Sequence, residues 1–477
     1  MMSQYDYDLI CIGSGPAGQR CAVQAAKLGK KVALIEKRRC VGGVCLETGT
    51  IPSKTFREAV RSFGSQQGLD HGISLSPKAR PTIEQLLGRV GRVIERESQV
   101  QIHQLHRNDI DVMLGAARFE DEHTITIEAD SGSRTLTGEH FMIAIGTQPA
   151  RPRGVQPDGM TIIDSDGIMN LKKLPQTMAV VGAGVIGIEY ATMFASLGVE
   201  VTVIDKRTRP LEFLDHELVD ELIYQMRRAE ITLRLGEGVE SLDIVYNPQP
   251  QGMIELDSGK HIVADVVLYS AGRVGATDKV NAAAAGLTAD DRGRLKVDDQ
   301  FRTEVPHIFA AGDVIGFPSL AATSAEQGRL AACHMFDVAA EKMSPHFPFG
   351  IYAMPEISMV GATEQELTAQ KVPYETGIAR YREIARGQIL GDDSGLFKMI
   401  FHRDTRKLLG VHCIGTGATE LVHVGQAVLA LDGGLDYFLS TIFNYPTLAE
   451  CYKVAALNAA NKLKRLRFVS SPASVAV

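Results

Sequence analysis

The sequence lacks long apolar runs and a strong excess of charge of either sign. Hydrophobic residues make up 45% of the 477 positions, yet nowhere do they form the continuous stretch of about 20 that spans a membrane. The first residues, MMSQYDYDLICIG, contain no basic segment followed by an apolar one, so we expect no secretory signal. The net charge of −7 provides no general attraction to nucleic acid or to acidic membranes.

Cysteine is scarce, and its count of seven is odd. Scattered cysteines in a long chain do not indicate a disulfide framework, so we predict a cytoplasmic protein in a reducing compartment. The 13 histidines show no metal-ligand spacing, and we predict no metal site. His412 and His423 are therefore interpreted as packing or surface residues.

The chain contains an internal repeat. YDLICIGSGPAGQRCAVQAAKLGKKVALIEK matches MAVVGAGVIGIEYATMFASLGVEVTVIDK in its apolar strand, glycine-rich turn, predicted helix and second strand with a terminal acid. Equivalent positions lie 169 residues apart, as Gly29 and Gly198 or Glu36 and Asp205 do. Each copy carries G-x-G-x-x-G, formed by Gly13, Gly15 and Gly18 in the first and by Gly182, Gly184 and Gly187 in the second.

This pattern predicts two dinucleotide-binding sites. The glycines permit a tight turn, a close approach of backbone to a pyrophosphate, and close packing of helix on strand. The helix N-terminus attracts the phosphates, and the acid can accept hydrogen bonds from ribose hydroxyls. A single G-x-G-x-x-G is weak evidence, whereas a complete unit that recurs in register is much stronger.

Two other segments are candidates for ligand contact. Gly42 and Gly43 follow the first repeat and allow backbone to lie close to a ligand. HIFAAGDV places Asp313 after an apolar strand, where its carboxylate could bind a polyol or could equally cap the next helix.

Taken together, the motifs resemble the flavoprotein disulfide reductases, a family that includes lipoamide dehydrogenase, glutathione reductase and mercuric reductase. The resemblance rests on GSGPAG, GGVCLETGTIPSK, IAIGTQP, GAGVIGIEY, AGR, FAAGDV, YAMPEISMVGATE and NYPTLAE, which span nearly the whole chain. It implies an α/β fold with two Rossmann-like domains, one for FAD and one for NAD(P), and an α+β C-terminal dimerisation domain. It also implies a homodimer.

The resemblance also implies roles for individual residues. Asp313 would hold the FAD ribityl chain, and Lys54 and Glu189 would form an ion pair beside the flavin. The FAD-contacting residues would be Gly13, Gly15, Gly18, Glu36, Gly43, Lys54, Gly146 and Asp313. The NAD(P)-contacting residues would be Gly182, Gly184, Gly187, Glu189, Asp205, Arg207 and Gly272.

Five domain segments are expected. They are an FAD-binding part over 1–150, an NAD(P)-binding domain over 151–275, a resumed FAD-binding part over 276–347, an interface domain over 348–466 and a flexible tail over 467–477. In the interface domain we predict strands at IYAMP, KMIFH and LLGVHCIG, and helices at ELVHVGQAVLAL and AECYKVAALNAANKL.

The sequence departs from the family pattern at its redox-active cysteine pair. Cys45 keeps the first position, but Thr50 replaces the second cysteine, and a hydroxyl cannot shuttle electrons as a dithiol does. The histidine that the family contributes from the partner subunit is replaced by Tyr445, while Glu450 is retained. Cys40 is also five residues from Cys45, but this pair is out of phase with IPSK, and we interpret both as ordinary thiols.

Without a dithiol, electrons must leave the flavin directly, and a second nicotinamide is the simplest acceptor. GTIPSK, FNYPT and VAALN also resemble the soluble, Si-specific pyridine nucleotide transhydrogenases within the family. We therefore expect ping-pong hydride transfer between NADPH and NAD⁺, with FAD as cofactor. The alternatives are a reductase of quinones or other small acceptors, a dihydrolipoamide dehydrogenase-like dithiol enzyme, or a non-enzymatic redox sensor that binds FAD and reports the nicotinamide pool to a partner.

Such an enzyme must accept both NAD and NADP. VTVIDKRTR, at the end of the second repeat, places Asp205 for the ribose hydroxyls of NAD and Lys206 and Arg207 for the 2′-phosphate of NADP. The alternative is a solvated basic turn after a strand. A dual role predicts that Arg207→Ala raises KM for NADPH far more than for NADH.

Overall fold

We analysed a computed structural model that describes residues 4–67, 80–151 and 157–470. The chain forms two compact units, each built from two separate stretches of sequence. Unit 1 comprises residues 1–174 and 269–343, and unit 2 comprises residues 175–268 and 344–477. Each unit contains one copy of the internal repeat.

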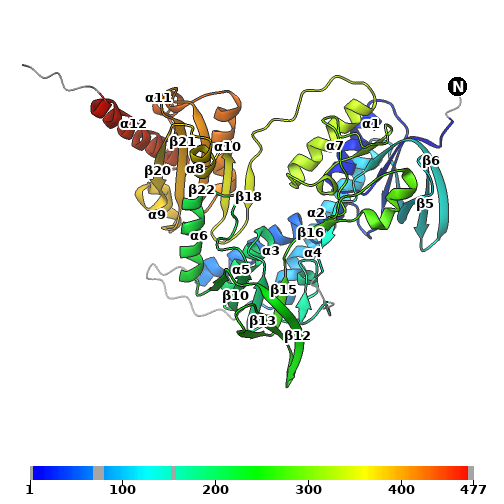
Figure 1. Cartoon of the computed structure of the whole chain (residues 1–477), viewed down its shortest axis with the longest axis horizontal. Helices are drawn as coiled ribbons and strands as arrows, with labels where there is room; N and C mark the ends of the chain where they lie inside the picture. The colour runs from blue at the N-terminus through cyan, green and yellow to red at the C-terminus, as the bar shows by residue number, and fades with distance from the viewer. Residues whose placement is uncertain (1–3, 68–79, 152–156, 471–477) are drawn as a thin grey trace, which may run out of the picture. The chain divides into compact units, whose positions relative to one another are not determined.

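Unit 1 is organised around a seven-stranded sheet with the order β3-β2-β1-β6-β5-β4, and β17 also pairs with β6 (Figure 1). β1, β2, β3, β6 and β17 are parallel, and β4 and β5 pair antiparallel next to β6. The bounds are β1 Tyr7–Ile12, β2 Val32–Glu36, β3 Asp111–Leu114, β4 Ala116–Phe119, β5 Thr124–Ala129, β6 Gly132–Ile143 and β17 Ile308–Ala310.

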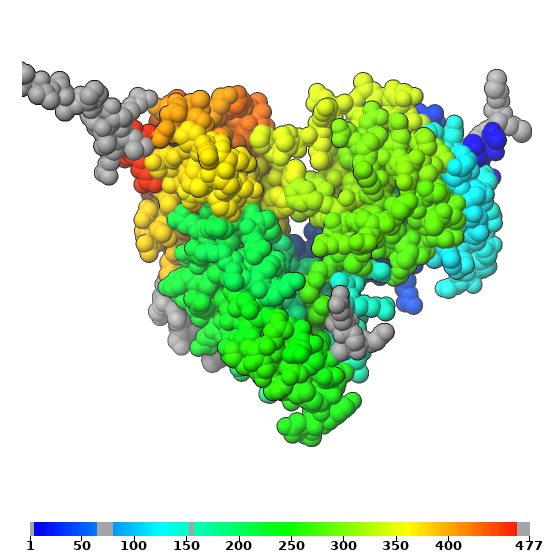
Figure 2. Space-filling model, in the orientation of Figure 1, coloured from blue at the N-terminus to red at the C-terminus, as the bar shows by residue number. Residues whose placement is uncertain are grey.

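Helices α1 (Pro16–Lys27) and α7 (Ala321–Met335) pack side by side in unit 1. Their contact requires a glycine, because a Cβ on Gly328 would lie 2.0 Å from the backbone oxygen of Ala17. Figure 2 shows the later, yellow-green segment of the unit packed beside the cyan one, although the two are far apart in the sequence. The remaining elements are α2 Gly43–Glu47, α3 Thr50–Gln67, α4 Ile83–His106, β7 Thr147–Pro149, β8 Ile162–Ile163, β16 Arg273–Gly275 and the 3₁₀ turns η1 Gly167–Asn170, η2 Thr277–Val280, η3 Ala282–Ala285 and η4 Asp313–Ile315.

The first part of unit 2 repeats the strand–turn–helix design. β9 (Thr177–Val181), β10 (Glu200–Asp205) and β11 (Thr232–Leu235) are parallel, and β15 (Val266–Tyr269) lies beyond β9. The same region contains two helices between its strands, α5 Val185–Ser196 and α6 His216–Arg228. A separate antiparallel sheet contains β12 Val239–Asn247, β13 Gln249–Leu256 and β14 His261–Ala264.

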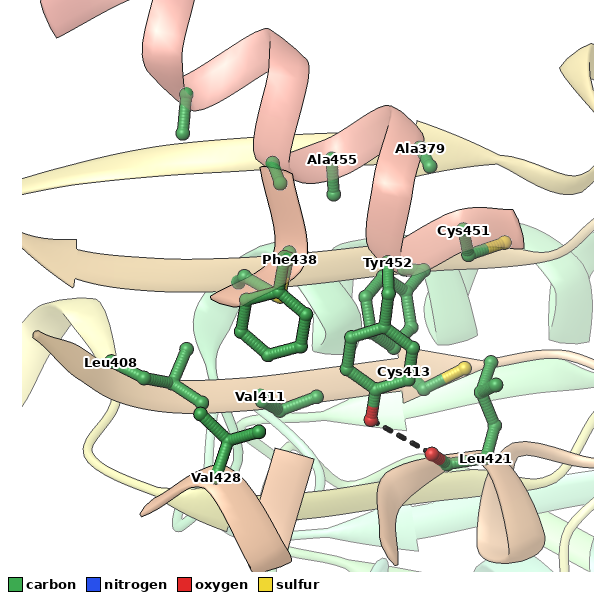
Figure 3. Packing of buried hydrophobic residues seen from close by; sticks show 14 of the residues in the cluster. Ala379, Leu408, Val411, Cys413, Leu421, Val428, Phe438, Cys451, Tyr452 and Ala455 are labelled. Carbon is green, nitrogen blue, oxygen red and sulfur yellow. Dashed lines mark hydrogen bonds between the residues drawn. The ribbon is translucent and has the colours of Figure 1, made fainter. Parts of the chain in front are cut away.

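The C-terminal part of unit 2 is an antiparallel sheet of order β18-β19-β22-β21-β20 with helices. Its bounds are β18 Phe349–Ile351, β19 Ile357–Gly361, β20 Tyr374–Arg380, β21 Leu396–His402, β22 Leu408–Ile414, α8 Glu364–Ala369, η5 Tyr381–Glu383, α9 Ala385–Leu390, α10 Ala418–Ala430, α11 Leu435–Ser440 and α12 Glu450–Ser470. Figure 3 shows its core, where the Tyr452 ring packs near Phe438 and the Tyr452 hydroxyl donates to the Leu421 carbonyl at 2.8 Å.

The expected α/β class is confirmed, and so are most of the predicted interface elements. The segment IYAMP is an exception, because only Ile351 lies in a strand and β19 begins after Pro355. Proline lacks an N–H for the strand ladder and restricts the residue before it. α12 continues to Ser470, so the first four residues of the tail expected over 467–477 are helical. Residues 471–477 lie outside the described residues.

Candidate active site

The two halves of the repeat fold alike, element by element. α1 and α5 have bounds that differ by the same 169 residues as their glycines, and β2 and β10 end at Glu36 and Asp205. Both helices are followed by a left-handed glycine, Gly29 at φ +76° and Gly198 at φ +77°. The equal spacing in sequence is therefore an equal geometry in space.

The first turn has no room for side chains on its inner face. Gly13 has φ +101°, and a Cβ there would lie 2.4 Å from the Ala144 carbonyl oxygen. A Cβ on Gly18 would lie 1.9 Å from the Gly13 oxygen. Gly15, in contrast, has open space within 4 Å of its Cβ position. The turn is thus packed on one side and open on the side where a pyrophosphate would bind.

A cavity of about 570 Å³ in unit 1 brings the predicted FAD residues together. Its lining includes Gly13, Gly15, Glu36, Gly43, Cys45, Thr50, Gly146 and Asp313. Gly18 and Lys54 are not part of the lining; Gly18 is buried in α1, and the Lys54 amino group lies 3.3 Å from the Ser53 hydroxyl. The glycine turn, the open volume and the acid at the strand end fit a bound dinucleotide such as FAD.

Glu36 is held firmly at the edge of this cavity. One carboxylate oxygen accepts from the Ser14 backbone N–H at 3.0 Å and from the Ser14 hydroxyl at 2.5 Å. The other oxygen accepts from the Arg38 backbone N–H at 2.8 Å. The Arg38 guanidinium points elsewhere, to Glu47 and, at 3.8 Å, to Asp166. Glu36 is thereby oriented, and one of its oxygens has a single donor.

Cys45 and Thr50 meet at the wall of the cavity. Cys45 lies in α2 and Thr50 begins α3, and the Thr50 hydroxyl is hydrogen-bonded to the Cys45 sulfur. Burial raises the pKa of the Cys45 thiol, and the bond from Thr50 and the charge of Lys54 only partly oppose this. Cys40 and Cys45 are both free thiols, and the pKa of Cys40 is also raised, first by burial and then by Glu47 and Glu36. Protonated thiols are poor nucleophiles and metal ligands.

Asp313 begins η4 and belongs to a small polar network that our sequence analysis did not foresee. Its carboxylate accepts from the Thr147 hydroxyl at 3.5 Å, and Arg273 donates to the same hydroxyl at 2.8 Å and to the Thr147 carbonyl at 2.9 Å. Burial raises the pKa of Asp313, against the charge of Arg273 and the bond from Thr147. Thr147 and Arg273 lie within the motifs IAIGTQP and AGR, so their presence beside predicted glycines was the available signal.

The second fingerprint, in unit 2, holds its acid in the same way. Gly182 has φ +108° and donates to the Ile204 carbonyl at 2.8 Å, Gly184 precedes α5, and Gly187 is buried in that helix. Asp205 is 7% exposed and accepts from the Ala183 backbone N–H at 2.6 Å. The Arg207 guanidinium donates to both Asp205 oxygens, at 2.9 and 2.5 Å. The Lys206 side chain is exposed.

The other predicted residues are distributed over both units. Gly272, with φ +119°, belongs to unit 1, where its carbonyl accepts from the Ala150 N–H at 3.0 Å. Glu189, in α5 of unit 2, is 3% exposed and accepts from the Tyr352 N–H at 2.8 Å. Tyr445 is 68% exposed in the loop before α12. Glu450 begins α12, and within the described residues its buried Oε2 atom has no hydrogen-bond partner.

Three carboxylates in unit 2 lie close enough together to suggest a cation. Asp215, Glu217 and Glu364 have oxygens within 4.8 Å of one another. The Lys398 amino group lies 2.8 Å from Asp215 and 3.1 Å from Glu217 and also contacts Glu364. The lysine therefore supplies the positive charge at this position. Separately, no helix among residues 4–67, 80–151 and 157–470 has the length and apolar character required to cross a bilayer.

Comparison with known proteins places this geometry in a family. The sequence model described as pyridine nucleotide-disulphide oxidoreductase matches residues 7–328, and the dimerisation domain of the same family matches residues 347–456. The chain belongs to the pyridine nucleotide-disulphide oxidoreductase family. The expected resemblance to flavoprotein disulfide reductases, with a C-terminal dimerisation domain, is thus confirmed.

Several members of the pyridine nucleotide-disulphide oxidoreductase family are similar over nearly their whole length. The chain is 52% identical over 464 residues to the soluble pyridine nucleotide transhydrogenase of Mycobacterium bovis (strain BCG / Pasteur 1173P2), covering 97% of this chain and 98% of the relative. It is 43% identical over 468 residues to the soluble pyridine nucleotide transhydrogenase of Colwellia psychrerythraea, covering 97% and 100%. The HOCl-induced flavoprotein disulfide reductase RclA from Escherichia coli superimposes with a TM-score of 0.85 at 25% identity, covering 94% of this chain and 99% of that structure.

Proposed function

We propose that this protein is an FAD-dependent transhydrogenase that moves hydride between NADPH and NAD⁺. One observation carries the proposal. Thr50 occupies the position where a disulfide reductase would need its second thiol, and its hydroxyl lies next to the Cys45 sulfur in the wall of the cavity. The relatives named soluble pyridine nucleotide transhydrogenase support the same function. Si-specific transfer and a cytoplasmic location, both expected from the sequence, belong to this proposal.

In this proposal the cavity of unit 1 binds FAD, and the second fingerprint binds the nicotinamide substrates. FAD, when bound, supplies a group that can accept and donate hydride. Gly13, Gly15 and Gly18 shape the turn for the pyrophosphate, and Glu36 and Asp313 contribute carboxylates for hydroxyl groups. The protonated Cys45 thiol takes no electrons. The roles expected for Lys54, Glu189, Tyr445 and Glu450 remain predictions.

The proposed function implies that hydride transfer has no strong thermodynamic preference for one direction. The nicotinamide ring is identical in NADH and NADPH, and the 2′-phosphate lies far from the reacting carbon. The equilibrium constant is therefore close to unity, and the ratios of the cellular NAD and NADP pools set the direction of transfer.

The decisive experiment is a comparison of acceptors with NADPH as the donor. We expect kcat/KM for a thio analogue of NAD⁺ to exceed the values for a quinone and for lipoamide by at least tenfold. We also expect Cys45→Ser to leave transhydrogenation within about twofold, because no electron passes through the sulfur. A higher kcat/KM for the quinone would make the protein a quinone reductase, and lipoamide turnover that Cys45→Ser abolishes would make it a dithiol enzyme.

A further inference from the structure

The internal repeat provides a matched comparison for the site around Asp205. Glu36 and Asp205 are equivalent, and both accept from the backbone N–H between the first two fingerprint glycines, at 3.0 Å from Ser14 and 2.6 Å from Ala183. Both also accept, at 2.8 Å, from the backbone N–H two residues later, that of Arg38 or Arg207. The two carboxylates thus have the same backbone frame.

The arginine side chains of the two copies behave differently. Arg38 is paired with Glu47 and Asp166, away from Glu36. Arg207 folds back on its own acid, with Nε 2.9 Å from one Asp205 oxygen and Nη2 2.5 Å from the other. Each oxygen of Asp205 therefore has one backbone donor and one guanidinium donor.

The Asp205 carboxylate and the Arg207 guanidinium are the two groups that would distinguish NAD from NADP, and in this structure they bind each other. The ribose hydroxyls of NAD are hydrogen-bond donors and need a carboxylate that can accept. The 2′-phosphate of NADP needs a guanidinium that can donate. While Arg207 stays on Asp205, the acid is neutralised and the guanidinium edge is occupied.

We propose that Arg207 is an exchangeable occupant of Asp205, displaced from the carboxylate by the ribose of NAD(H) and drawn from it by the 2′-phosphate of NADP(H). This inference rests on the proposed function, since only an enzyme that uses both nucleotides needs such an exchange. The Asp205 side chain is 6% exposed and fixed by backbone bonds, whereas that of Arg207 is 37% exposed and free to turn outward. A guanidinium exposed to this degree stays hydrated when it leaves the carboxylate, so a nucleotide can take its place without burying an unpaired arginine.

The exchange makes a prediction that a simple phosphate-binding role does not. If Arg207 only bound the phosphate, its removal would weaken NADP(H) and leave NAD(H) unchanged. If Arg207 also competes for Asp205, its removal must improve the binding of nucleotides without the phosphate. The two effects must have opposite signs in a single variant.

The test uses the FAD-loaded protein and two adenosine fragments, 5′-AMP and adenosine 2′,5′-bisphosphate, with Kd measured by calorimetry at constant ionic strength. For Arg207→Ala we expect the bisphosphate to bind at least about tenfold more weakly and 5′-AMP to bind about three- to tenfold more tightly. The tighter binding of 5′-AMP should disappear in Arg207→Ala combined with Asp205→Asn, which still accepts from Ala183.

Arg209→Ala is the matched control, because Arg209 lies two residues further on and has its own carboxylate partner, Asp220, at 2.7 Å. Arg209→Ala removes the same charge but leaves the ion pair between Arg207 and Asp205 intact, so 5′-AMP should bind as in the wild type. Unchanged or weaker 5′-AMP binding in Arg207→Ala would overturn the exchange. The fragments have no nicotinamide ring, so this outcome is independent of whether the wild type transfers hydride from NADPH to a NAD⁺ analogue.

Discussion

At the scale of single residues, the contact between Cys45 and Thr50 decides which chemistry the cavity can support. The Thr50 hydroxyl lies beside the sulfur, and burial raises the pKa of the Cys45 thiol, which favours its protonated form. A protonated thiol beside an alcohol has no partner for disulfide formation, so under the proposed function Cys45 and Thr50 form part of the cavity wall and no redox centre.

The same contact predicts that a single substitution can restore a disulfide. In Thr50→Cys, the new sulfur should lie close to Cys45, because the oxygen it replaces is hydrogen-bonded to that sulfur. We expect mild oxidation to remove two thiols per chain from this variant, measured by thiol titration of the unfolded protein. Thr50→Ser and the double variant Cys45→Ser, Thr50→Cys are the controls and should lose none. An unchanged thiol count in Thr50→Cys would show that the two positions cannot approach.

Lys398 is a buried cation that contacts three carboxylates. Its amino group is fully buried among Asp215, Glu217 and Glu364, and it links α6, α8 and β21 within unit 2. Burial lowers the pKa of a lysine, but here the attraction of Asp215 and the hydrogen bonds outweigh it, and the pKa of Lys398 is raised. Burial would likewise raise the pKa of Asp215, but His412 and Lys398 lower it.

We expect Lys398→Met to reduce the free energy of unfolding by about 3–5 kcal/mol, because it leaves the buried Asp215 carboxylate without the counter-charge of the lysine. Urea unfolding of the wild type and the variant at neutral pH measures this difference. Lys407→Met is the control, since Lys407 pairs with Asp432 at an exposed position, and it should cost no more than about 1 kcal/mol. Equal losses in the two variants would contradict the role assigned to Lys398.

The pKa shifts also predict how this stabilisation depends on pH. The pKa of Asp215 is lowered in the folded protein, so its contribution is present above about pH 4 and is lost as the pH falls through the folded value. The pKa of Lys398 is raised, so its contribution is present below about pH 10 and is lost as the pH rises through the folded value. The difference in unfolding free energy between wild type and Lys398→Met should therefore be widest between these limits, as measured by unfolding at several pH values.

At the scale of elements, the strand–turn–helix unit formed by β1, α1 and β2 combines two kinds of glycine. Gly18 is required by the protein itself, because a Cβ would collide with the Gly13 oxygen. Gly15 faces open space and has φ −64°, which alanine adopts easily. The first glycine preserves the fold, and the second preserves access for a ligand.

Alanine substitutions should separate these two demands. We expect Gly15→Ala to keep the unfolding temperature of the flavin-free protein within a few degrees but to lower the affinity for FAD by at least tenfold. Gly18→Ala should destabilise the flavin-free protein by about 1–3 kcal/mol, because the clash must be relieved by backbone movement. Calorimetry of the flavin-free forms and titration with FAD measure the two effects. A large loss of stability in Gly15→Ala would contradict this assignment.

Elements with a repeated pattern were the ones that could be predicted from sequence. The glycines predicted where α1 and α5 end, because a left-handed residue after a helix is usually a glycine. The terminal acids marked the ends of β2 and β10. The strand at IYAMP was misplaced, because Pro355 interrupts the strand ladder and the pairing resumes only in β19. The network of Thr147, Arg273 and Asp313 depends on tertiary contacts between distant segments, and the sequence specifies no distances between them.

At the scale of the whole molecule, the region matched by the dimerisation domain exposes several large apolar side chains. They are Ile389, Leu390, Leu431, Tyr437, Ile442 and Tyr445, and Ile442 is 94% exposed. Large exposed apolar side chains are candidates for a contact surface. Together with the matched domain, they support the expected homodimer.

We expect Ile442→Asp to raise the dissociation constant of the dimer by at least about a hundredfold, because a two-fold interface loses the burial of both copies of the side chain. Sedimentation at several protein concentrations measures the change. Met160→Asp is the control, since Met160 is 71% exposed and lies outside the dimerisation match. A wild-type dissociation constant in Ile442→Asp would place the interface elsewhere.

The identical offset between the elements of the two nucleotide-binding cradles has a consequence for their history. A shared offset in strands, helix and capping glycine is the imprint expected of one ancestral segment that was duplicated and then diverged. The backbone frame of the acid survived in both descendants, whereas the arginine two residues later acquired a different neighbour in each. Each cradle is thus a natural reference for the other, and the two differ in the partner of the arginine two residues after the acid.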